Sequence, residues 1–131
     1  MADEALVESL VLESVKFVEE LDAQGDPPSN ALWHYSSDAE EWRLLVAGPT
    51  FDGLLPHDIR QAYQKIGTAI RRAALSSLTI AGVKPIRTDD ALLIATRLVV
   101  STPPGRVVRA HYRNNTFSGI YVKEMLVLRA A

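Results

Sequence analysis

The chain contains no cysteine among its 131 residues, which excludes disulfide bonds, thiolate metal sites and cysteine nucleophiles. It also has no long apolar run, because stretches such as residues 91–95 and 98–100 are far shorter than the roughly 20 residues that cross a bilayer. Its acidic beginning lacks the basic and apolar segments of a secretory signal. We therefore expect a cytoplasmic protein that does not span a membrane.

The common catalytic and nucleotide-binding fingerprints are missing as well. No phosphate-binding glycine loop, dinucleotide Gly-x-Gly-x-x-Gly, Gly-x-Ser-x-Gly or His-Glu-x-x-His occurs. The three histidines, His34, His57 and His111, lie on separate expected elements, so no local spacing joins two of them as metal ligands. The sequence therefore predicts no cofactor and no metal, and it does not assemble the residues of an enzyme.

The composition that is present is ordinary for one globular domain over residues 1–131, with 47% apolar and 23% charged residues. Charge is unevenly distributed. Residues 1–26 carry eight acidic residues against Lys16 alone, whereas the rest of the chain carries more basic than acidic residues. This pattern indicates an acidic N-terminal helix and the start of a linker, either packed against a mildly basic body or available to a basic partner.

Three helices are predicted from apolar residues spaced three and four apart and from the residues that begin such segments. The first covers residues 4–23. The second starts with Pro56 in its first turn and has a buried stripe that ends at Ala73. The third covers residues 89–99, with Thr88 as its N-cap.

Five strands are predicted from branched and aromatic residues between turn signals. They cover residues 31–35, 41–47, 78–83, 107–113 and 120–128. The first two form a hairpin, the last two form a second hairpin with a longer connection over residues 114–119, and residues 48–53 form a turn or loop. This order favours an α+β fold, with a mixed, mostly antiparallel five-stranded sheet packed with about three helices.

One row of polar residues in the C-terminal half has a spacing that suits a site. Arg109, His111 and Arg113 alternate, so they share one face of one strand. Guanidinium groups offer planar donors to phosphate or carboxylate, so the row is a candidate anion site for a small enzyme or sensor. The alternative is the solvent-exposed face of a sheet, with the residues between them facing the core.

Nucleic-acid binding is a second alternative. From Arg60 onward, twelve Lys and Arg residues stand against Asp89, Asp90 and Glu124. The basic residues are mostly dispersed singly and the whole chain has a net charge of −2, which argues against an unaided nonspecific binder. The candidate nucleic-acid-binding residues are Arg71, Arg72, Arg106, Arg109 and Arg113.

Aromatic residues concentrate on the first hairpin, at Trp33, Tyr35 and Trp42. They fit either a central hairpin covered on both faces or an exposed aromatic surface used for dimerisation. Trp33 and Tyr35, together with Phe17 of the first helix, are the candidate interface residues. The favoured function is a non-enzymatic interaction or accessory module that self-associates, most simply as a two-fold homodimer, or that binds another protein.

Residues 31–35 and 41–47, together with the closing hairpin through Arg129, resemble segments of uncharacterised bacterial α/β proteins. The resemblance covers residues 31–50 and 105–129 and rests on structural residues. It implies a bacterial cytoplasmic protein. Because no activity is attached to that group, the resemblance transfers no catalytic or binding position.

Overall fold

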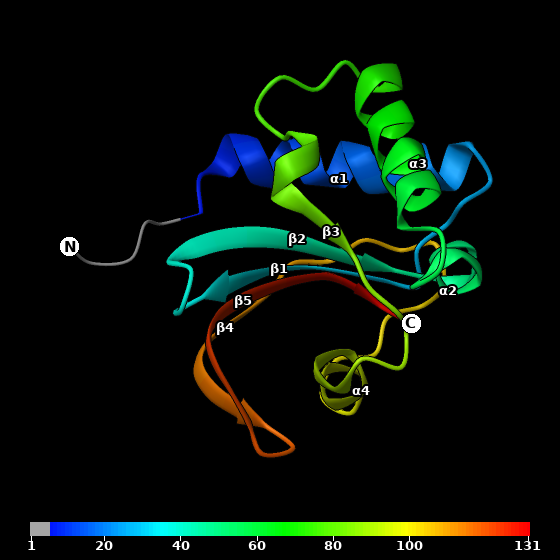
Figure 1. Ribbon diagram of the computed structural model, residues 1–131. Helices are drawn as coiled ribbons and strands as arrows, with labels where there is room; N and C mark the ends of the chain where they lie inside the picture. Colours follow the sequence, from blue (N-terminus) through cyan, green and yellow to red (C-terminus); the bar gives the residue numbers. More distant parts are fainter. Residues whose placement is uncertain (1–5) are drawn as a thin grey trace.

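The computed structural model describes residues 6–131 and contains one open five-stranded sheet (Figure 1). The strands are β1 (Asn30–Ser36), β2 (Glu41–Ala47), β3 (Val83–Pro85), β4 (Ala110–Phe117) and β5 (Ile120–Ala130). Their order across the sheet is β3-β2-β1-β5-β4. Only β2 and β3 run parallel, and the other neighbours are antiparallel. The structure confirms the predicted α+β fold and its mixed, mostly antiparallel sheet.

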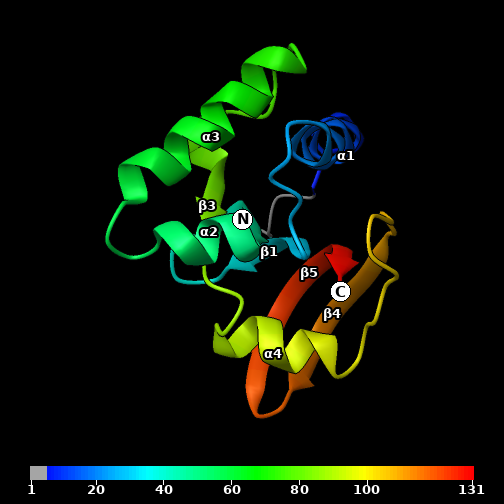
Figure 2. The same ribbon diagram turned by 90° about the vertical axis from the view of Figure 1, so that its right-hand side faces the viewer.

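Helices lie on both faces of this sheet. On one face lie α1 (Glu8–Ala23) and α3 (Ile59–Arg72), and on the other lies α4 (Ala91–Arg97), against β4 and β5 (Figure 2). The short helix α2 (Pro49–Leu54) follows β2. Each face therefore has its own apolar core, and the sheet separates the two.

The first helix is held by its apolar stripe. Val11, Phe17 and Leu21 are buried on the side facing the sheet, as the three- and four-residue spacing predicts. The indole Nε1 of Trp33 donates a hydrogen bond of 3.0 Å to the hydroxyl of Ser14 beneath the helix. The helix begins at Glu8, later than predicted, and part of its expected start lies outside the described residues.

The described chain contains four helices, because the segment predicted as a loop at residues 48–53 includes α2. Pro49 occupies its first position, where a missing N–H has no cost, and Phe51 is buried beneath it. Gly48 fits closely just before the helix, since a Cβ there would lie 3.0 Å from the carbonyl oxygen of Pro27.

The starts of the other two helices also differ from the prediction. Pro56 precedes α3 instead of standing in its first turn, and the carboxylate of Asp58 caps the helix by accepting from Gln61 N–H at 3.2 Å. The N-cap of α4 is Asp90, whose carboxylate accepts from Leu92 N–H at 2.9 Å. The predicted cap, Thr88, instead donates its hydroxyl to the carboxylate of Asp52.

The third strand was predicted at residues 78–83 and is displaced. Ile80–Gly82 forms a single 3₁₀ turn, and only Val83–Pro85 pairs with β2. The backbone just before this turn is held by α1 and not by a neighbouring strand. The Ser77 and Leu78 N–H groups both donate to Glu13 Oε1 of α1 at 2.9 Å. A side-chain contact with Glu13 thus takes the place of the strand pairing that was expected from residue 78 onward.

The last hairpin is tighter than predicted. Residues 114–117 continue β4, and the turn consists of Ser118 and Gly119 alone. Both have positive φ, at 49° and 82°, as a two-residue hairpin turn of this handedness requires. The expected longer connection over residues 114–119 was wrong.

Replacement of Phe17 by Ala tests the docking of α1. The side chain is fully buried, so we expect the free energy of unfolding to fall by about 3–5 kcal/mol. Leu12→Ala, on the exposed side of the same helix, should cost less than about 1 kcal/mol. Urea denaturation of both variants measures the difference, and equal losses would show that α1 is not held by its buried stripe.

The bond between Glu13 and the backbone at Ser77 and Leu78 gives a pH-dependent prediction. Hydrogen bonds from the backbone, that of Leu78 foremost, lower the pKa of the Glu13 carboxyl below its ordinary 4.5. The unfolded chain therefore binds the proton more readily, so this stabilisation is present above about pH 4.5 and is lost as the pH falls through the folded pKa.

We expect the difference in unfolding free energy between wild type and Glu13→Gln to shrink on acidification to below pH 4. Glu19→Gln, exposed on the same helix, serves as the matched control and should show a weaker trend. Denaturation curves at several pH values measure both. A Glu13→Gln difference that does not change with pH would contradict the assignment.

Candidate functional site

The predicted row does lie on one side of the sheet. Arg109 immediately precedes β4, and His111 and Arg113 lie within it, whereas Ala110 and Tyr112 pack into the core on the opposite face. The row borders a groove of about 350 Å³ beside the start of α1. The groove is also lined by Leu6, Glu8, Val11, Glu124 and Leu126.

The side chains of this row form hydrogen bonds with carboxylates from other elements. Arg109 donates to Glu8 of α1 at 2.8 Å, and Arg113 donates to Glu124 of β5 at 3.1 Å. A ring nitrogen of His111 lies 2.7 Å from the same Glu124 oxygen. An incoming anion would have to compete with both carboxylates. The positive charges of Arg109 and Arg113 are therefore balanced by the negative charges of Glu8 and Glu124.

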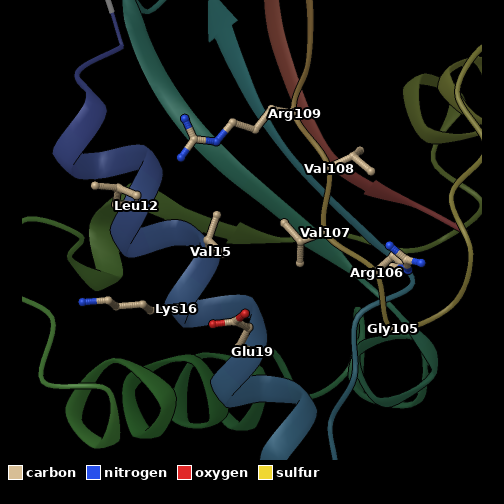
Figure 3. Close-up of a pocket in the computed structure, with 9 residues that line it drawn as sticks. All are labelled: Leu12, Val15, Lys16, Glu19, Gly105, Arg106, Val107, Val108 and Arg109. Carbon is tan, nitrogen blue, oxygen red and sulfur yellow. The ribbon is translucent and has the colours of Figure 1, made fainter.

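A second groove, of about 570 Å³, separates α1 from the chain that leads into β4 (Figure 3). Leu12, Val15 and Val107 give it apolar walls, and Lys16 and Glu19 place opposite charges along α1. Figure 3 also shows Arg109 extending towards α1. Its guanidinium donates a hydrogen bond to Glu8 of that helix at 2.8 Å. Arg106 and Arg109 also line this groove, so three basic residues stand against one carboxylate there, and Arg109 is already paired with Glu8 of α1.

The five candidate nucleic-acid-binding arginines are divided between two places. Arg71 and Arg72 end α3, while the other three follow the segment from residue 106 into β4. Between these places lies α1, which binds the chain after α3 through Glu13 and Arg109 through Glu8. The structure does not gather the five onto one continuous basic surface.

The three candidate interface residues are buried within the chain itself. Phe17, Trp33 and Tyr35 are 0%, 2% and 4% exposed. Both faces of the sheet are covered by helices, so the central-hairpin interpretation of the aromatic cluster is the one that the structure supports. These side chains offer no surface for a contact with another chain.

Large apolar side chains stand exposed on several elements, and three of them lie close together in the sequence on α4 and just after it, at residues that the sequence reasoning did not select. Ile94, Leu98 and Val99 are 46%, 76% and 55% exposed, while Leu93 and Ala95 of the same segment are buried against the sheet. We call these three exposed residues the α4 patch. Its signal in the sequence is a short helix that is apolar all around, which a single buried face does not require.

A third concavity, of about 400 Å³, lies on the same face of the sheet as α4 and was also missed. We call it the His34 basin. His34 of β1 faces Arg43 of β2 across the ladder, and Lys84 of β3 faces Leu45. The basin is lined by His34, Ser36, Ala39, Glu41, Arg43, Leu45, Lys84, Ile86, Asp90 and Leu92.

His34 has a perturbed environment in this basin. Burial lowers the pKa of its imidazole below the ordinary 6.5, and the negative charge of Asp90 opposes that shift. The ring makes no hydrogen bond with any residue of the described part of the chain. His34 therefore presents a neutral imidazole with unused hydrogen-bonding capacity at neutral pH.

Comparisons of the chain with protein-family models, with curated proteins and with solved structures found no match. The resemblance to uncharacterised bacterial α/β proteins therefore stays an expectation. Among residues 6–131, no three His, Asp or Glu side chains cluster as metal ligands. None of the helices in that range is long and apolar enough to cross a bilayer.

Asp90→Asn tests the electrostatics of the basin. Asn keeps the helix cap but removes the charge that raises the pKa of His34, so we expect the His34 pKa to fall further below 6.5. Asp89→Asn, at an exposed residue paired with Arg87, should change it less. NMR titration of the His34 ring protons measures both shifts.

The lowered pKa of His34 also determines how the stability of the fold changes with pH. Because the unfolded imidazole binds a proton more readily than the folded one, His34 destabilises the fold as the pH falls below 6.5. A His34 pKa above 6.5 in the folded protein would contradict the assigned environment.

Proposed function

We propose that this protein is a non-enzymatic interaction module that self-associates through the α4 patch. The proposal rests on one observation: large apolar side chains stand exposed on α4 and just after it, while the opposite side of that helix is already packed on the sheet. Ile94 and Leu98 are four residues apart, so they are neighbours on the helix surface, and Val99 extends the patch.

The energetics favour covering this surface. Full burial of one such side chain is worth about 1.5–3 kcal/mol relative to exposure in water. A two-fold contact buries the patch of each chain against the patch of the other, so every apolar residue contributes twice. The aromatic residues of the first hairpin take no part in this proposal, because they belong to the chain's own core.

Two alternatives receive less support. Carboxylates already pair the side chains of the Arg109, His111 and Arg113 row, which disfavours an anion-binding enzyme or sensor there. The division of the arginines between α3 and β4 disfavours a nucleic-acid surface. A bacterial cytoplasmic setting, expected from the sequence alone, is part of the same proposal.

Leu98→Lys tests the self-association. Leu98 is the most exposed residue of the patch and lies at the end of α4, where a cation is tolerated by the helix dipole. We expect the wild type to sediment as a dimer, and Leu98→Lys to sediment as the 14.4 kDa chain with an unchanged melting temperature at low concentration.

Leu12→Lys is the matched control, since it introduces the same charge at a half-exposed leucine of α1. It should leave the dimer intact. A wild type that remains at 14.4 kDa at several hundred micromolar would overturn the proposal. Loss of the dimer in Leu12→Lys but not in Leu98→Lys would move the contact to the groove beside α1.

A further inference from the structure

The unused hydrogen-bonding groups of the His34 basin are mainly donors. The Lys84 ammonium and the His34 ring have no hydrogen-bond or ion-pair partner among residues 6–131. The Ser36 hydroxyl oxygen accepts from Ala39 N–H at 3.2 Å, which leaves its own proton available. A ligand that completes these groups must therefore supply acceptors.

The carboxylates of the basin are already engaged. Glu41 accepts from Arg43 at 3.0 Å, and Asp90 accepts from the Leu92 backbone N–H at 2.9 Å as the cap of α4. One oxygen of each carboxylate is bonded in this way, whereas the Lys84 ammonium has no partner among the described residues. Lys84 is thus the charged side chain of the basin that lacks a partner in the described part of the chain, and its single positive charge matches one negative charge on a ligand.

The floor of the basin is apolar. Leu45 of β2, Ile86 after β3 and Leu92 of α4 are all partly buried and pack against the core on this face. Their exposed portions face the basin, beside the polar groups of the strands. A ligand seated there would place an apolar body on the floor and an anionic end against Lys84.

We propose that the His34 basin binds a small organic monoanion, a carboxylate attached to an apolar or aromatic body. Its volume of about 400 Å³ lies in the lower part of the range for small-molecule sites, which suits a single-ring compound better than a nucleotide. Lys84 supplies the charge, His34 and Ser36 supply hydrogen bonds, and the three apolar residues supply the contact area.

Binding of such an anion is coupled to protonation of His34. The charged groups that face this ring are Glu41 and Arg43 from β2, Lys84 from β3 and Asp90 from α4. A bound anion adds one more negative charge, so it raises the affinity of the imidazole for a proton. By linkage, the anion binds more tightly as the pH falls below 6.5, towards the lowered pKa of His34.

Benzoate and its neutral analogue benzamide are the probes for this site. In NMR titrations of the full chain, we expect benzoate to shift the resonances of His34, Leu45 and Leu92 saturably and to raise the His34 pKa. Benzamide should bind at least about tenfold more weakly, because it lacks the charge that pairs with Lys84. The same titrations at pH 6 and 7.5 measure the proton linkage.

Lys84→Gln removes the proposed anion partner from an exposed position, so the fold should tolerate it, and benzoate affinity should fall about tenfold or more. Lys16→Gln, at an exposed lysine of α1, is the matched control and should bind as the wild type does. No saturable shift with benzoate would overturn the proposal. Equal affinity for benzoate and benzamide, or an unchanged affinity in Lys84→Gln, would overturn it as well.

Discussion

One buried guanidinium joins the segments on which the rest of the fold depends. Arg129 of β5 is 1% exposed and donates to both carboxylate oxygens of Asp22, each at 2.9 Å. It also donates to the carbonyl oxygens of Pro28 at 3.0 Å and Arg106 at 2.8 Å. The end of α1, the loop before β1 and the approach to β4 thus meet at one charge, which stays buried because its hydrogen bonds replace water.

Arg129 faces α1 only because the β1–β5 ladder is irregular. Ala31 pairs with Arg129 and Leu32 pairs with Val127, so Leu128 is an extra residue on β5. This bulge turns Leu128 and Arg129 to the same side, towards α1, while Val127 packs on the α4 side. Strict alternation along residues 120–129 would have placed Arg129 on the same face of the sheet as Val127. The strand pattern alone therefore does not predict the hydrogen bonds between Arg129 and Asp22.

Local periodicity accounts for the correct sequence predictions, and contacts between distant residues account for the displaced third strand and for the carboxylate partners of the arginine row. The five strands in one sheet, the buried stripe of α1 and the shared face of Arg109 and His111 all arise from spacings of two or of three to four residues. The displaced third strand depends on Glu13, and the balanced charges of the row depend on Glu8 and Glu124, which lie on other elements. No pattern within a single segment carries that information.

Unequal covering of the two sheet faces explains where free surface remains. On the face that carries α1 and α3, the two long helices cover β1, β2 and part of β5, and Trp33 of the first hairpin is buried there. The row at β4 stays exposed beside α1. The other face has only the seven residues of α4, which cover β4 and β5 and leave the neighbouring ends of β1, β2 and β3 open as the His34 basin. Leu93 and Ala95 take the side of α4 that faces the sheet, so Ile94 and, just after the helix, Leu98 are left exposed. The α4 patch and the basin therefore have one structural origin.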